Sequence, residues 1–246
     1  METKDKLEIL SDEIEHEFDY LADCIWKLNE QLDVIKGNEL AKLELYHSDD
    51  PVGREIRWMF EGPKHETFFP TALNYAFVVL VFITLETQLM RLCDVLYEVK
   101  SFPVRAKDMS GSGLERYLSY LTKLAGVSRS KLPNWQAVSK LSIIRNCIVH
   151  ASGIVSYSND AQELRSMVRT RSYLTEWHRA NLEKYEKNKN GARLDYVGIA
   201  LSDDVEKLVI KQEYTHSVTG YARDFLLQIL GELGVNLHGK ELHWRK

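Results

Sequence analysis

The chain has 246 residues, of which 44% are hydrophobic and 28% are charged, a composition typical of a globular protein rather than a disordered one. Its 32 basic and 36 acidic residues give a net charge of -4, which excludes a uniformly basic surface for nucleic acid. Only 5 Pro and 13 Gly occur, so a turn-rich β-sandwich is disfavoured and helices are favoured.

The cysteine pattern and the apolar runs indicate the compartment. Cys24, Cys93 and Cys147 form no CxxC pair, which disfavours a disulfide scaffold or a zinc ribbon and favours the reducing cytosol. The N-terminus lacks the apolar region of a signal peptide. The longest apolar run, 75–85, is shorter than the roughly 20 residues that cross a bilayer. We therefore expect a cytoplasmic protein without membrane contact, cofactor or bound metal.

The first segment is the most periodic part of the chain. Its apolar residues recur every three or four positions, which predicts one long helix that ends at Gly37. That helix either lies on the body of its own chain or forms a seam between two chains. Residues 2–36 hold 11 acidic and 4 basic residues, a net of -7. The apolar positions are Leu7, Leu10, Ile14, Phe18, Leu21, Ile25, Leu28, Leu32 and Ile35.

The next segments lead to a second long helix. We expect a short helix over 39–46, an Asp-rich turn before Pro51, and a connection bracketed by Pro63 and Pro70. The following helix, 71–99, is apolar nearly all round in its first half, so we place it centrally in a bundle. Glu86 interrupts it and is either exposed or buried with a basic partner, because a lone buried charge is costly.

The second half of the chain completes an all-α bundle. Helices are predicted over 114–125 and over 135–151, the latter with Asn134 as N-cap and Gly153 as its stop. A polar helix over 159–190, a short extended segment or hairpin near 194–201, and a last helix from Ser202 or Asp203 to Leu233 follow. The expected organisation is a long N-terminal helix, 1–37, and a helical domain, 38–246.

One motif carries recognisable chemistry. Phosphate-binding glycine loops, HExxH and GxSxG are all absent, and what remains is an R-N-x-x-x-H string formed by Arg145, Asn146 and His150 on a predicted helix. A second pair, Arg171 and His178, has a similar spacing, but we interpret it as part of an exposed charged helix. The apolar series Val138, Leu141, Ile144 leads directly into Arg145 and favours the first pair.

This stretch resembles the signature helix of the HEPN superfamily, the higher eukaryote and prokaryote nucleotide-binding domains. The resemblance extends more loosely over about 65–235 and includes an acidic residue, here Glu86, on an earlier core helix. It implies a dimerising helical bundle. In catalytic members R-x(4–6)-H is the site of a metal-independent endoribonuclease, with one copy per subunit lining a composite cleft. Such proteins act in toxin–antitoxin and antiviral defence systems, whereas noncatalytic members are binding or assembly modules.

The residue chemistry agrees with RNA cleavage. A histidine near its ordinary pKa exchanges protons at neutral pH, so His150 is the candidate acid or base, and Arg145 is the candidate clamp for phosphate charge. Asn146 shares a helix face with His150 and is a candidate orienting residue. Residues 100–150 hold 9 basic and 2 acidic residues, a net of +7. Further RNA-contacting candidates are Lys140, Arg165, Arg169 and Arg171.

Three functions remain open at this level. The leading one is a homodimeric HEPN-type endoribonuclease with RNA as substrate. The second is a noncatalytic HEPN module that binds a protein or a nucleotide, with the N-terminal helix as its working surface. The third is a toxin whose cleft is covered by an antitoxin or another defence-system protein.

Overall fold

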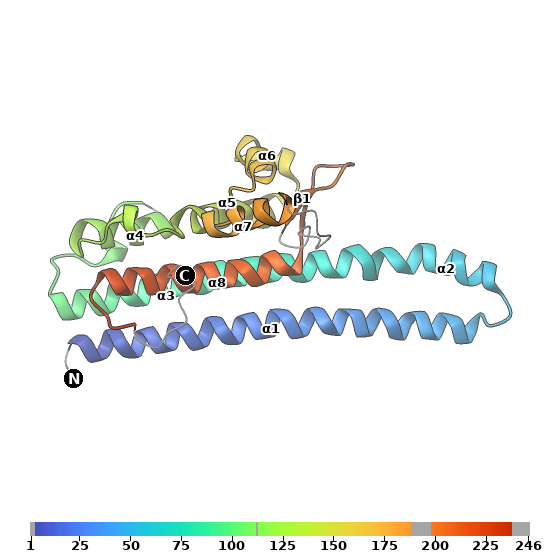
Figure 1. Ribbon diagram of the computed structural model, residues 1–246, viewed down its shortest axis with the longest axis horizontal. Helices are drawn as coiled ribbons and strands as arrows, with labels where there is room; N and C mark the ends of the chain where they lie inside the picture. The colour runs from blue at the N-terminus through green and yellow to red at the C-terminus, as the bar shows by residue number, and fades with distance from the viewer. Residues whose placement is uncertain (1–2, 112, 188–197, 238–246) are drawn as a thin grey trace.

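The computed structural model describes residues 3–111, 113–187 and 198–237 and confirms an all-α bundle (Figure 1). The long helices α1 (Thr3–Tyr46), α3 (Phe69–Lys100) and α8 (Gln212–Glu232) lie side by side, and α2 (Pro51–Pro63) continues the line of α3. The remaining elements are α4 (Gly113–Leu124), α5 (Trp135–Ala151), α6 (Ala161–Thr170), α7 (Glu176–Lys187), and strands β1 (Ile199–Leu201) and β2 (Leu208–Ile210).

Helix α1 packs on its own chain over its first half. The predicted apolar positions from Leu7 to Ile25 are buried in the common core, whereas Leu28 and Ile35 are 42% and 46% exposed. The predicted end at Gly37 is wrong, because the helix continues without interruption to Tyr46. A single glycine costs a helix about 1 kcal/mol, which the flanking turns of a 44-residue helix outweigh.

The second half of α1 and α2 form a two-helix arm. Figure 1 shows both helices extending beyond the other elements. The Asp-rich turn between them is confirmed, since Asp50 Oδ1 accepts the Gly53 N–H at 2.9 Å and caps α2. An ion pair of 2.9 Å between Lys36 and Glu66 joins α1 to the residues that follow α2.

The predicted connection between Pro63 and Pro70 is wrong, because the helix is continuous there. A π-helical turn over Lys64–Phe68 joins α2 to α3. Proline cannot donate the usual helical hydrogen bond, and the wider turn accommodates both prolines without breaking the helix. By length and composition alone, the combined helix Pro51–Lys100 contains a window that is apolar enough to cross a membrane, a test that the core helices of soluble proteins also pass.

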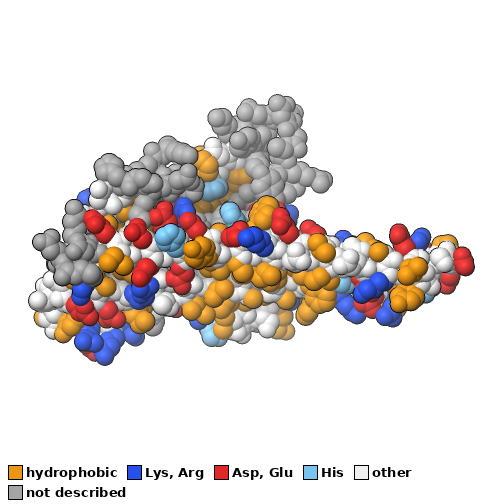
Figure 2. All heavy atoms as spheres, turned by 90° about the horizontal axis from the view of Figure 1, so that it is seen from below, with side chains coloured by type: hydrophobic (Ala, Val, Ile, Leu, Met, Phe, Trp, Pro, Cys, Tyr) orange, Lys and Arg blue, Asp and Glu red, His pale blue; other side chains and the backbone are white. Residues whose placement is uncertain are grey.

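Helix α3 occupies the centre of the bundle and contacts α1, α4, α5 and α8. Because α3 is apolar nearly all round, the one row of its side chains that no other described helix covers is also largely apolar. Figure 2 shows hydrophobic side chains gathered in a band along the body of the molecule. Within α3, the exposed row follows a spacing of three and four residues and comprises Ala72, Ala76, Leu80, Ile83, Thr87 and Met90.

Helices α4 and α5 lie where the sequence predicts them. Asn134 precedes α5 as expected, but its side chain does not cap the helix and instead donates to the Tyr221 carbonyl at 3.4 Å. The helix ends at Ser152 and Gly153, both with positive φ. Gly153 is required here, because a Cβ would overlap the hydroxyl of Tyr75 from α3.

Two predictions for the C-terminal third are wrong. The single polar helix breaks at Arg171–Thr175, where Tyr173 and Leu174 are buried and Arg171 has a φ of 54°. The extended segment predicted near 194–201 is confirmed at 199–201, which form the first strand of a hairpin, and 194–197 lie outside the described residues. The second strand, 208–210, lies inside the stretch assigned to the last helix, which begins at Gln212. A single antiparallel β-bridge between Ile154 and Lys207 attaches the hairpin to the segment after α5. This tertiary contact outweighs the helical pattern of the residues around 203–211.

We expect Phe18→Ala to lower the free energy of unfolding by about 3–5 kcal/mol, because this side chain is 1% exposed in the core between α1 and its neighbours. Urea denaturation measures the change. Tyr20, two residues away and 72% exposed, provides the control, and Tyr20→Ala should stay within about 0.5 kcal/mol of wild type. Equal effects of both changes would contradict the packing of α1 on the body.

Candidate functional site

The structure brings three of the predicted site residues together where α3 and α5 face each other. The Arg145 guanidinium lies over the Phe82 ring, 5.2 Å from its centroid, and donates from Nη1 to Asn146 Oδ1 at 2.9 Å. Arg145 also lies close enough to Glu86 for its charge to lower the pKa of that carboxyl. Arg145 is therefore the nearby basic group that the sequence required for a half-buried Glu86, and it acts through its charge, because no ion pair or hydrogen bond joins the two side chains among the described residues.

Glu86 is held against the first turn of α4. Its Oε1 is so close to Gly113, which has a φ of 50°, that a Cβ there would lie only 2.7 Å away. Burial raises the pKa of Glu86 above its ordinary value, and the opposing effect of Arg145 is smaller. Tyr117, one turn along α4, belongs to the same cluster, because burial and the nearby Glu86 charge both raise the pKa of its hydroxyl. The cluster thus joins three helices.

His150 lies outside this cluster within one chain. It is exposed in the last turn of α5, next to Val149, which is 46% exposed. Five residues along a helix correspond to about 140° of rotation and about 7.5 Å of rise from Arg145. No hydrogen bond joins Asn146 to His150 among the described residues, and Asn146 Oδ1 accepts from Arg145 instead. One chain therefore presents the arginine and the histidine on adjoining but different faces.

The other predicted RNA-contacting residues lie in two parts of the structure. Lys140 pairs with Glu163, which links α5 to α6. Arg165 donates from Nε and Nη2 to the Glu206 carboxylate at 2.9 and 2.5 Å, so it holds the turn between β1 and β2. Arg165, Arg169 and Arg171 line one pocket together with Lys211, a residue that sequence reasoning missed.

A second pocket, of about 500 Å³, lies between α7, α8 and the start of α5 and was also missed. His178 is half-buried here, with Nδ1 at 2.9 Å from Thr175 Oγ1, so assigning Arg171 and His178 to one exposed helix was wrong. No local motif signals this pocket, because its residues come from three separate segments. Its walls include Asn134, Trp177, His178, His216, Tyr221 and Asp224.

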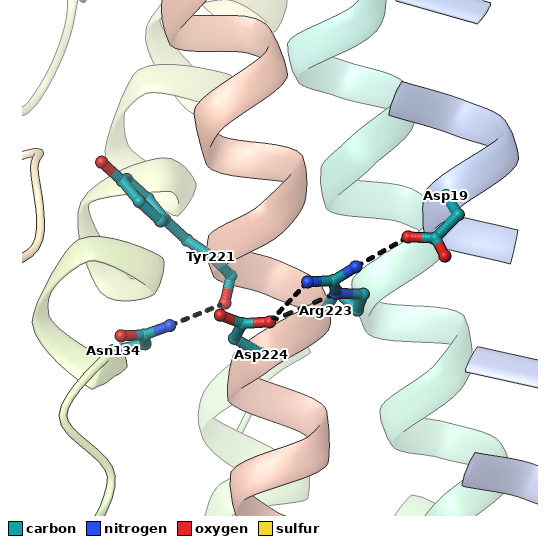
Figure 3. A network of polar contacts seen from close by, with 5 residues as sticks. All are labelled: Asp19, Asn134, Tyr221, Arg223 and Asp224. Atoms are coloured by element: carbon teal, nitrogen blue, oxygen red, sulfur yellow. Dashed lines mark hydrogen bonds and ion pairs between the residues drawn. The ribbon is translucent and has the colours of Figure 1, made fainter. Parts of the chain in front are cut away.

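A polar network ties this second pocket to the core (Figure 3). Arg223 donates to Asp19 of α1 at 2.7 Å and to Asp224 at 3.1 Å, and Asp224 is only 3% exposed. Burial alone would lower the pKa of Arg223, but the two carboxylates raise it above its ordinary value. The network fixes α8 against α1 and holds the α8 wall of the pocket in place.

Metal and thiol chemistry have little support at either place. Over the part of the chain that the structure describes, no three His, Cys, Asp or Glu side chains are grouped so as to hold a metal ion. Cys147, next to the motif, is buried, and burial raises the pKa of its thiol. A raised pKa keeps a thiol protonated and unreactive.

Comparison of the chain with protein-family models, curated proteins and solved structures finds no match. The HEPN resemblance therefore depends on the motif and its surroundings alone.

We expect Glu86→Gln to become more stable relative to wild type as the pH rises from 4 to 7. The pKa of Glu86 is raised in the folded protein, so its stabilising contribution is complete below its ordinary value of 4.5 and is lost as pH rises through the raised value. Urea midpoints of both proteins at pH 4 and pH 7 measure the difference. The control is Glu55→Gln, a change at an exposed position of α2, which should keep the urea midpoint of wild type at both pH 4 and pH 7. If the midpoint difference between Glu86→Gln and wild type were the same at the two pH values, the burial of Glu86 would be contradicted.

Proposed function

We propose that the protein is a metal-independent endoribonuclease of the HEPN type that acts in the cytoplasm as a homodimer, in a toxin–antitoxin or antiviral defence system. The observation that carries this proposal is the position of the R-N-x-x-x-H helix: Arg145 donates to Asn146 and lies near Glu86, and His150 is exposed further along α5 on an adjoining face. The exposed apolar row of α3 lies on the helix that supplies Glu86.

The chemistry requires two proton transfers. The ribose 2′-OH attacks the adjacent phosphorus, its proton passes to a base, and the leaving 5′-oxygen takes a proton from an acid, which leaves a 2′,3′-cyclic phosphate. His150 from the two subunits would supply the base and the acid. Arg145 would stabilise the charge that grows on the phosphate oxygens, and its hydrogen bond to Asn146 would hold the guanidinium in place.

A dimer explains two otherwise unrelated features. Arg145 and His150 point in directions that differ by about 140° on one helix, so a single chain does not converge them on one phosphate. The α3 row repeats at the three- and four-residue spacing of paired helices, and Leu80, Ile83 and Met90 are 44%, 48% and 44% exposed. Two copies that cover this row would bring both α5 helices to the same cleft.

A noncatalytic module is the second candidate, and the arm favours it. On α2 several apolar side chains face outward, with Val52, Met59 and Phe60 exposed by 66%, 70% and 69%, beside the exposed charges of Glu55 and Arg57. Exposed apolar rows of this kind are typical of protein-binding surfaces. A partner on the arm is compatible with either activity, and an antitoxin is one such partner.

We expect the purified protein to cleave single-stranded RNA in the presence of EDTA and His150→Ala to lower the rate at least 100-fold, because both proton transfers lose their group. Product analysis should detect 2′,3′-cyclic phosphate ends. His16→Ala, at an exposed histidine of α1, serves as the control and should cleave like wild type. Equal cleavage by wild type and His150→Ala would refute the catalytic assignment and leave the noncatalytic module.

We expect Ile83→Glu to convert the dimer to a monomer, because a charge in the covered row would have to be desolvated. Light scattering after size-exclusion chromatography measures the mass. Ile9→Glu is the matched control, since Ile9 on α1 is 47% exposed and Ile83 is 48% exposed. The Ile83→Glu variant should also lose RNA cleavage. An unchanged mass for it would place the dimer interface elsewhere.

A further inference from the structure

A basic pocket of about 510 Å³ lies where α6, the turn after it, α7, β1 and the start of α8 meet. It is separate from the cluster around Arg145. Four of its walls are cationic side chains, Arg165, Arg169, Arg171 and Lys211, and the described lining includes no Asp or Glu. In a chain with a net charge of -4, this density of positive charge is a local feature that the overall composition does not require.

Arginine is the residue type that best fits a phosphate group. Its planar guanidinium donates two parallel hydrogen bonds to phosphate oxygens, and these charge-assisted bonds are stronger than neutral ones. Arg165 already makes such a paired contact with the Glu206 carboxylate, which fixes one edge of the pocket. Arg169 and Arg171 then contribute positive charge from the last turn of α6 and the residue that ends it.

The backbone at Arg171 allows the side chain to be removed without loss of the helix end. Arg171 ends α6 with a φ of 54°, and its N–H bonds to the carbonyls of Met167 and Val168. Ser101 and Ser152 end α3 and α5 in the same left-handed conformation. Helices that end in this way usually have glycine or asparagine there, since other side chains are strained by about 1 kcal/mol or more, so glycine at position 171 should keep or improve the cap.

The rest of the pocket offers an apolar floor. Leu174 and Leu182 are 1% and 6% exposed, and the buried Tyr173 hydroxyl accepts the Ile199 N–H at 3.1 Å. The volume lies within the range of about 300–1,000 Å³ that small-molecule sites occupy. A ligand with an anionic end and a partly apolar body therefore matches both walls and floor.

We propose that this pocket binds the phosphate group of a nucleotide. The phosphate has two sources, the terminal monoester of a mononucleotide and the backbone diester of an RNA strand. The pocket is connected to the end of α5 by short backbone contacts, since Leu208 N–H donates to Gly153 O at 2.8 Å and Val155 N–H donates to Glu206 O at 3.0 Å. An RNA strand at His150 would thus have a phosphate-binding site nearby. Of the two phosphate sources, only the RNA backbone rests on the proposed ribonuclease function.

The test compares the binding of three probes by isothermal titration calorimetry at low salt: adenosine 5′-monophosphate, adenosine, and a 12-nucleotide single-stranded RNA with a 5′-hydroxyl. Adenosine should bind at least tenfold more weakly than its monophosphate if the monoester is the ligand. Strong binding of the RNA, with weak binding of the monophosphate, would identify the backbone diester. Either result supports the proposal.

The variants separate binding from folding. Arg171→Gly should weaken the bound probe about tenfold, the effect of one charge-assisted hydrogen bond, while the melting temperature stays equal or rises. Arg169→Glu should weaken it at least as much. Lys42→Glu is the control, because it makes the same charge change on the arm and should stay within twofold of wild type.

Two results would overturn the proposal: adenosine binding as tightly as its monophosphate with no RNA binding, or unchanged probe affinity in both Arg171→Gly and Arg169→Glu. The outcome is distinguishable from that of the ribonuclease assay. His150→Ala should bind the probes like wild type while it loses RNA cleavage. The cleavage assay therefore tests the ribonuclease proposal, and probe binding tests the phosphate pocket.

Discussion

Burial of apolar surface around α3 is the constraint on which the rest of the structure depends. Helices α1, α5 and α8 pack on three sides of α3, and the buried side chains of all four helices form one continuous core. The fourth side of α3 remains exposed as the row that includes Leu80, Ile83 and Met90. The same all-round apolar character therefore builds the fold of one chain and leaves a face suited to a second copy.

The position of the polar groups follows from that packing. Because α5 lies directly against α3, Arg145 lies over the Phe82 ring and near Glu86, and Gly113 leaves room for the carboxylate. The carboxyl is held partly away from water, so its pKa rises, while the guanidinium limits the rise. The end of α5 then carries His150 into solvent and the following chain into the hairpin that borders the basic pocket.

The two pockets have different electrostatic character. The pocket beside α7 is lined by imidazoles, aromatic rings and carboxylates, and the Arg223 network fastens it to α1. The pocket beside α6 is lined by arginines and Lys211. A phosphate would therefore be repelled by the carboxylates of the first pocket and attracted by the second, which is the electrostatic basis of the proposed phosphate site.

Periodicity along the chain was enough to predict the all-α class, the helices around 71–99, 114–125 and 135–151, and the buried stripe of α1. These features depend on neighbouring residues three or four positions apart, which sequence displays directly.

The ends and interruptions of the helices were not predictable in the same way. Gly37 lies inside a helix because the flanking turns outweigh its low propensity, Pro63 does so because a π-helical turn follows it, and β2 forms because the end of α5 provides pairing partners. Likewise, the sequence by itself determined that Arg145, Asn146 and His150 share one helix. Only the tertiary structure decided that Glu86, 59 positions before Arg145, lies near it and that Lys211 joins three arginines, because contacts between distant segments are set by how helices pack and leave no local pattern in the chain.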